Sequence, residues 1–145
     1  MTARRVLIDS GPLLALFNGS DRWHPTVVAW LRAHPQAKLF TTWPVTTEVC
    51  ALLARRIGNS AALDFLSWVQ RGGVELDQPQ AESLGEVLHI CQRFADLPLD
   101  LADASIAEAA ARLRIRDILS VDSDFHVYRD RQGRALNHLL RPHGT

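Results

Sequence analysis

The stretch that decides the fold is LPLDLADASIAEAAARLRIRDILSVDSDF, residues 97–125. It opens with the acidic pair Asp100 and Asp103, continues in an alanine-rich helical pattern, and reaches a short apolar run that ends in a second acidic pair, Asp122 and Asp124. The pattern predicts one helix and one strand, each with acid at one end. Gathered carboxylates repel each other unless a cation lies between them, and their hard oxygens suit Mg²⁺ or Mn²⁺. The first hypothesis is therefore a divalent-metal site.

Strand and helix patterns alternate through the rest of the chain. The apolar run Val6–Ile8 and the strand-like segments Lys38–Thr42 and Val74–Leu76 predict strands, and each precedes a helical pattern. Near the end, two apolar runs flank a turn-like stretch at residues 130–133, which favours a terminal strand or a hairpin. The alternation predicts a three-layer α/β/α, Rossmann-like fold with a mostly parallel central sheet of four to five strands. A length of 145 residues fits a single domain over residues 1–145.

Three acids have both a functional and a structural interpretation. Asp9 lies at the carboxyl end of the first predicted strand, where open α/β sheets place ligands, but aspartate also caps helices. Glu48 lies in the second turn of a helix that begins near Trp43, beside its buried stripe. Asp100 can cap the next helix, which places Asp103 as in a capping box. These alternatives stay open for each residue taken alone.

Composition limits the partners that the chain can attract. Sixteen basic residues balance sixteen acidic ones, so a nucleic acid or an anionic membrane would need a local patch. The two cysteines, Cys50 and Cys91, lack metal or redox spacing and predict reduced thiols. The first residues resemble neither a signal peptide nor a membrane span. We therefore expect a cytoplasmic protein.

Four segments in order give the sequence a specific family resemblance. They are VLIDSGPLLAL, TTWPVTTEVCALL, DLADASIAEAA and SVDSDFHVYR, which together extend from Val6 to about Arg129. This pattern resembles the PIN-domain ribonucleases, and most closely the VapC-type toxins of bacterial toxin–antitoxin pairs. The resemblance implies a PIN-like fold, and an endoribonuclease that hydrolyses RNA phosphodiester bonds with Mg²⁺ or Mn²⁺.

The resemblance also implies site residues and partners. Asp9, Glu48, Asp103 and Asp122 occupy the catalytic positions, with Asp9 and Asp103 as metal ligands. Asp100 and Asp124 are secondary acids, and Ser10 fits a supporting position. The implied partners are tRNA or another structured RNA, a small antitoxin, and a second copy in a homodimer. Candidate phosphate contacts are the late arginines Arg112, Arg114, Arg116, Arg129, Arg131 and Arg134.

Two other functions compete with the nuclease. A non-catalytic PIN-like module that only binds RNA or protein would keep a repulsive acidic cluster for no use. A Rossmann-like phosphotransfer enzyme would also use a strand-end aspartate. A dehalogenase-type phosphatase, however, needs a second aspartate where this chain has Gly11, and a receiver domain needs a late lysine, whereas Lys38 is the single lysine.

Overall fold

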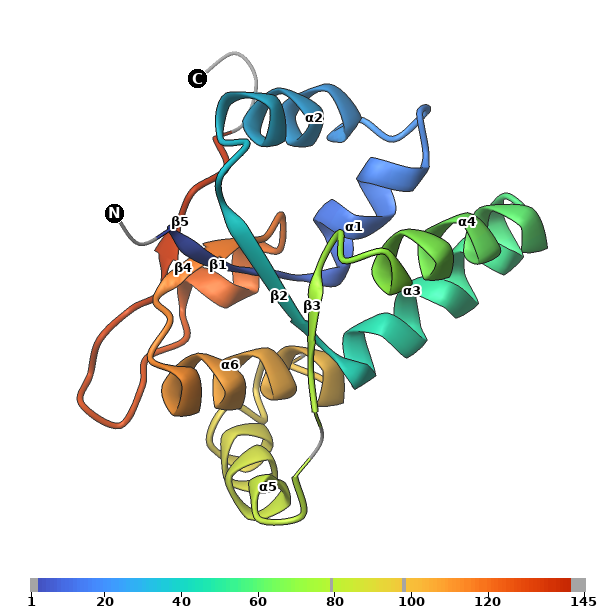
Figure 1. Cartoon of the computed structure of the whole chain (residues 1–145). Coiled ribbons are helices and arrows are strands. Elements are labelled where there is room, and N and C mark those ends of the chain that lie inside the picture. Colours follow the sequence, from blue (N-terminus) through green and yellow to red (C-terminus); the bar gives the residue numbers. More distant parts are fainter. Residues whose placement is uncertain (1–2, 79, 98, 142–145) are drawn as a thin grey trace.

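The structure, a computed structural model, describes residues 3–78, 80–97 and 99–141. Within these ranges, five parallel strands form one sheet in the order β3-β2-β1-β4-β5 (Figure 1). Their bounds are β1 Arg5–Ile8, β2 Lys38–Thr42, β3 Glu75–Asp77, β4 Asp117–Leu119 and β5 Asn137–His138. The all-parallel sheet of five strands confirms the predicted α/β class.

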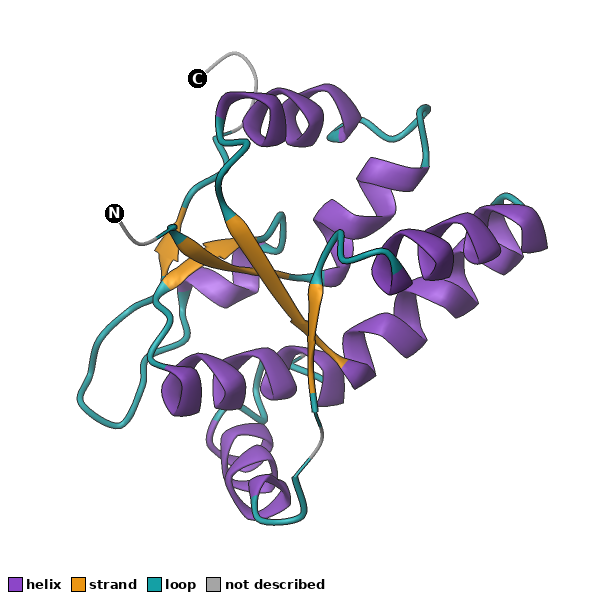
Figure 2. Cartoon of the chain, in the orientation of Figure 1, coloured by secondary structure: helices purple, strands orange, loops and turns teal. Residues whose placement is uncertain are grey.

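Helices cover both faces of this sheet (Figure 2). Helices α1 and α2 connect β1 to β2, helices α3 and α4 connect β2 to β3, and these four helices pack together. Helices α5 and α6 connect β3 to β4. Figure 1 shows α5 and α6 on the side of the sheet away from α1 and α2. The helices are α1 Ser10–Phe17, α2 His24–Ala33, α3 Trp43–Arg56, α4 Asn59–Gln70, α5 Ser83–Arg93 and α6 Leu101–Leu113.

The carboxyl ends of β1, β2, β3 and β4 meet at one edge of the sheet. Ile8 of β1 is in register with Leu119 of β4, and the backbone N–H of Asp9 donates to the Leu119 carbonyl at 3.0 Å. Each connection between parallel strands brings the chain back to the amino-terminal edge of the sheet before the next strand begins. Residues that directly follow the strands therefore share the carboxyl edge.

Helix α6 explains the alanine-rich pattern. All residues from Ala102 to Ala110 are buried, because α6 lies between the sheet and α5. Small side chains let the helix approach both layers closely. Its first turn is thus held in a fixed place beside the carboxyl edge of the sheet.

Some element boundaries differ from the sequence-based expectation. Strand β4 ends at Leu119, and the residues up to Val121 already leave the sheet. The terminal segment forms β5, which pairs parallel with β4, so the chain does not make a hairpin there. Proline suits the first turn of a helix, so the sequence predicts a helical start at Pro79, which lies outside the described residues, and α5 begins at Ser83.

Candidate active site

Asp9 is a buried carboxylate between β1 and α1. It is the N-cap of α1, it is 2 % exposed, and its Oδ1 accepts a hydrogen bond from the Ser10 N–H at 2.8 Å. The Ser120 hydroxyl donates to its Oδ2 at 3.3 Å. The capping and site interpretations are therefore compatible, since one oxygen faces the helix start and the other faces the end of β4.

Asp103 and Asp100 hold each other at the start of α6. The Asp103 N–H donates to Oδ1 of Asp100 at 3.0 Å, and the Asp100 N–H donates to Oδ2 of Asp103 at 3.3 Å. This reciprocal pair is a capping box, which satisfies two backbone donors that a helix start leaves open. Asp103 is buried and Asp100 is exposed. The box fixes the Asp103 carboxylate against the sheet edge.

Glu48 and Asp122 approach the same place from two other elements. Glu48 is half-buried in α3, and Asp122 is half-buried just after β4, where its N–H donates to the Ser120 hydroxyl at 3.2 Å. The negative charges of both residues raise the pKa of Asp9. The structure thus brings together the four carboxylates that the sequence singled out.

Burial and mutual repulsion shift the two inner carboxyl groups. Burial raises the pKa of Asp9 to about 6, against the lowering effect of its hydrogen bonds from Ser10 and Ser120, while Asp122 and Glu48 add to the rise. Burial also raises the pKa of Asp103 to about 8, helped by Asp9, Asp100 and Asp122. These residues lie at a point of strongly negative potential, which a cation would relieve.

The donor set fits a hard divalent cation, because it consists of carboxylate oxygens that destabilise each other's charge. Across residues 3–78, 80–97 and 99–141, however, no three acids, histidines or cysteines already have the spacing of a metal site. A bound ion would have to draw the carboxylates closer together. Asp9 and Asp103 are the two most deeply buried acids available to it.

The secondary residues have different positions. Ser10 supplies its backbone N–H to Asp9, so its supporting contact is made by the main chain. Asp124 belongs to the short helix η1 (Ser123–His126), and its side chain lies outside what the structure describes.

Most of the six late arginines contact groups other than the four clustered acids. Arg114, which follows the last turn of α6, is roughly 16 Å along the helix axis from Asp103, given a rise of ~1.5 Å per residue. Most of the group already has partners. Arg112 pairs with Asp77 and Glu108, Arg116 and Arg134 pair with Asp130, Arg131 pairs with Glu86, and Arg129 donates to the carbonyls of His126 and Tyr128.

Sequence reasoning missed Ser120. This buried serine bridges the Asp9 carboxylate and the Asp122 backbone, and so links the ends of β1 and β4. Its signal was a polar residue between the apolar run of β4 and the first acid of SVDSDF.

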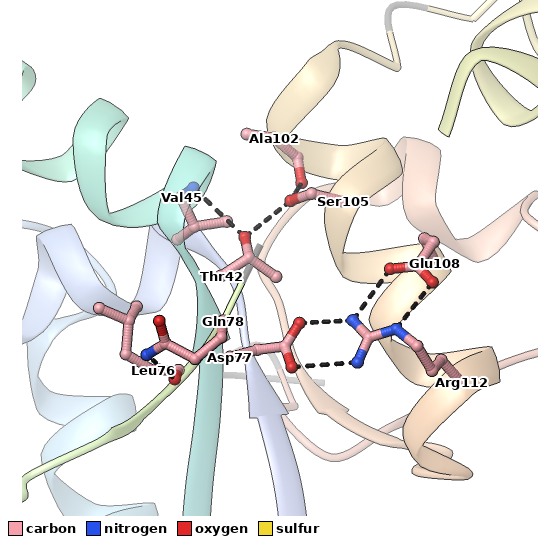
Figure 3. A network of polar contacts seen from close by, with 9 residues as sticks. All are labelled: Thr42, Val45, Leu76, Asp77, Gln78, Ala102, Ser105, Glu108 and Arg112. Atoms are coloured by element: carbon pink, nitrogen blue, oxygen red, sulfur yellow. Dashed lines mark hydrogen bonds and ion pairs between the residues drawn. The ribbon is translucent and has the colours of Figure 1, made fainter. Parts of the chain in front are cut away.

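A second polar network at the same edge was also missed (Figure 3). Asp77, the last residue of β3, accepts two hydrogen bonds from Arg112 of α6, and the same guanidinium donates to both oxygens of Glu108. Next to it, the hydroxyls of Thr42 and Ser105 share a hydrogen bond of 2.7 Å. The network ties the edge strand β3 and the end of β2 to α6.

Comparisons with known proteins identify the family of the sequence. The sequence model described as "PIN domain" matches residues 6–130. The chain is 29% identical over 117 residues to Ribonuclease VapC26 of Mycobacterium tuberculosis, which covers 81% of this chain and 86% of that protein.

Solved structures show the same fold. One is Mycobacterium tuberculosis VapC20, a Sarcin-Ricin loop cleaving toxin, with a TM-score of 0.76 and 21% identity over 82% of this chain and 91% of that one. Another is VapBC2 from Rickettsia felis bound to a DNA fragment from its promoter, with a TM-score of 0.64 and 10% identity over 83% and 90% of the two chains. No helix in the described part of the chain is long and apolar enough to cross a membrane.

Proposed function

This chain belongs to the PIN domain family, and on that premise we propose that it is a divalent-metal-dependent endoribonuclease that acts as the toxin of a type II toxin–antitoxin pair. The likeness to Ribonuclease VapC26 along most of both chains supports the activity. The observation that carries the proposal is the convergence of Asp9, Glu48, Asp103 and Asp122, whose charges act on each other at one sheet edge.

Each acid has a role that follows from its burial. Asp9 and Asp103 would hold the ion directly, Glu48 would orient a water molecule or the outer shell, and Asp122 would complete the site. When bound, Mg²⁺ or Mn²⁺ lowers the pKa of a water molecule and offsets charge on a phosphodiester. Ser120 keeps the Asp9 carboxylate turned toward β4. The capping box with Asp100 holds the Asp103 carboxylate in place.

The RNA substrate would be a tRNA or another structured RNA. Arg114, Arg116, Arg131 and Arg134 line one hollow of about 690 Å³ near the end of α6, and we assign them to phosphates away from the cut. The side chains of Arg131 and Arg134 are each 60% exposed, so phosphate oxygens can reach their guanidinium groups. Arg112 and Arg129 donate to groups of the protein itself, and we assign them a structural role.

The proposed partners are a cognate antitoxin that covers the acidic edge and a second copy of the chain, in the cytoplasm. On α4, Leu63 is 56% exposed and Leu66 is 42% exposed, which makes this face a candidate dimer surface. Trp68 of the same helix packs on Phe17 instead, with ring centroids 5.4 Å apart. Sedimentation of wild type and Leu66→Glu would test the dimer, which the variant should weaken.

The nuclease proposal is tested with purified protein and a panel of structured RNAs in Mg²⁺ or Mn²⁺. Wild type should cut at least one RNA internally, EDTA should stop the reaction, and Asp9→Asn should abolish it. Asp64→Asn, an exposed aspartate on α4, is the matched control and should cut normally. A wild-type protein that cuts no RNA, or an Asp9→Asn variant with full activity, contradicts the proposal.

A further inference from the structure

Trp43 is an exposed aromatic side chain beside the acidic site. It is the first residue of α3, directly after β2 reaches the carboxyl edge, and it is 44% exposed. Pro44 follows it and fixes the start of the helix that carries Glu48. Large exposed aromatics next to a nuclease site are suited to stacking on bases, because every base has a π-face.

Trp43 forms part of two neighbouring hollows. The first is open and runs over Trp43, Pro44 and Thr47 to Glu48 and Asp100, so it is continuous with the acidic edge. The second, of about 180 Å³, lies between the start of α3, α5 and α6. Leu101 lines both hollows and is 57% exposed. A group bonded to a phosphate at the acids therefore has a direct way into the second hollow.

The second hollow has apolar walls and a polar floor. Leu84, Val87 and Leu101 line it together with Trp43, and the network of Asp77, Arg112 and Glu108 also borders it. A cavity of about 150 Å³ is enough to bind benzene, so a hollow of about 180 Å³ accommodates an aromatic ring. Its size and apolar walls favour a flat, largely uncharged group.

The charges at the floor exclude phosphate as the occupant. The donors of Arg112 already meet all four carboxylate oxygens of Asp77 and Glu108, which leaves one net negative charge on the group (Figure 3). Such a floor repels a phosphate but can accept hydrogen bonds from ring N–H and exocyclic amino groups. Gln78, Gln80 and Ser83 add polar side chains around it. A nucleobase combines the required ring with those donors.

We propose that this second hollow takes an unstacked nucleobase of the RNA substrate, which stacks on Trp43 while the adjoining phosphate lies at the acids. The inference rests on the proposed nuclease function and adds the place where a base beside the cut bond is held. A base can enter only when it has left a helical stack, so the cut bond lies next to an unpaired nucleotide in a loop or bulge. A continuous duplex of the same sequence is then a poor substrate.

The experiment pairs a protein change with an RNA change. A hairpin that wild type cuts is compared with the same hairpin made abasic at each nucleotide flanking the cut, and both are given to Trp43→Ala. Losing the stack should raise KM about tenfold or more, either through Trp43→Ala or through one abasic position. The two changes together should raise KM no further than one alone. Trp43→Phe should recover most of the loss on intact RNA.

The control variant is Ile57→Ala at the opposite end of α3, an apolar residue of similar exposure, which should leave KM unchanged on every RNA. Thermal unfolding of each variant checks that the fold is intact. Equal losses for Trp43→Ala on intact and abasic RNA would overturn the inference while leaving the nuclease in place. If Trp43→Ala cleaved RNA as wild type does but no longer bound an antitoxin, the inference would also be overturned, because the hollow would then hold protein. Absence of cleavage by wild type would overturn both.

Discussion

The Ser120 hydroxyl donates to Oδ2 of Asp9 across 3.3 Å, and the hydroxyl oxygen in turn accepts a hydrogen bond from the Asp122 N–H. One small buried side chain thus connects the acid after β1 with the acid after β4. Asp9 cannot rotate away without losing this contact and the contact with Ser10. The relationship makes Ser120 a positioning residue for two carboxylates.

Ser120→Ala should weaken cleavage without unfolding the protein. The variant removes two hydrogen bonds, one to Asp9 and one from the Asp122 N–H, which costs on the order of 2 kcal/mol of stability, and it frees the Asp9 carboxylate to turn. We expect a fall in kcat with little change in KM, measured by cleavage of a fixed RNA. Ser67→Ala on α4, whose hydroxyl bonds Arg71, is the control. Full activity in Ser120→Ala would show that the contact does not position Asp9.

Stability in EDTA should fall as the pH rises. The folded pKa of Asp9 is about 6, above its ordinary value of 3.8, so the folded state binds the proton more tightly than the unfolded chain does. This contribution is complete below about pH 4 and is lost as the pH passes through 6; Asp103 extends the loss toward pH 8. For Asp9 the change is on the order of 3 kcal/mol, at ~1.4 kcal/mol per pKa unit.

Asp9→Asn isolates this effect, because the amide has the same shape and does not titrate. Guanidinium unfolding of both proteins at pH 5 and pH 8, in EDTA, should show that the variant gains relative to wild type at the higher pH. Asp64→Asn should follow wild type at both values. A wild-type to Asp9→Asn difference that is the same at both pH values would contradict the raised pKa of Asp9.

Sequence reasoning reached most of this site for a physical reason. A strand-end acid and a helix-start acid are local features, and the parallel order of strands brings such features to one edge. The positions of Asp9, Asp103 and Asp122 at that edge therefore follow from the sequence pattern. The family match confirms the predicted PIN resemblance, and the sheet confirms the predicted fold.

The rest depended on contacts between distant segments. The pairing of Arg112 with Asp77 joins α6 to the edge strand β3, and the sequence around either residue does not predict this contact. The late arginines form one basic patch in the sequence, yet nearby acids neutralise most of them in space. The sequence predicts only that Trp43 lies at a helix start. Its exposure and its place in a hollow beside α5 and α6 depend on how these helices pack.

Divalent metal should stabilise the protein through the inner carboxylates. At a free Mn²⁺ concentration about 100 times Kd, binding to the folded state adds ~2.7 kcal/mol, which appears as a rise in Tm. Asp103→Asn should remove most of this rise, because it removes a buried ligand charge. Asp64→Asn should keep it. An equal rise in all three proteins, measured by calorimetry at pH 8, would mean that the ion binds elsewhere.

Gly11→Ala should disturb the acid after β4. A Cβ at this position would overlap the Val121 side chain, and Val121 directly precedes Asp122. Because α1 and the sheet are both packed, the Val121 segment should move, and kcat should fall on the order of tenfold or more. Gly85→Ala on α5, where the added Cβ meets open space, is the control and should gain about 0.5–1 kcal/mol of stability. Unchanged kcat in Gly11→Ala would show that this segment tolerates the shift.

Arg112→Ala should reduce stability more than it reduces RNA binding. The Arg112 side chain is 25% exposed and its guanidinium holds two carboxylates, so its removal leaves Asp77 and Glu108 facing each other and costs about 3 kcal/mol. Urea unfolding measures this loss, and Arg56→Ala at the exposed end of α3 is the control. The slope of log affinity for RNA against log salt should stay as in wild type, because Asp77 and Glu108 already hold the Arg112 guanidinium and we expect it to bind no phosphate. A slope reduced by about one, with stability intact, would instead place Arg112 on the RNA backbone.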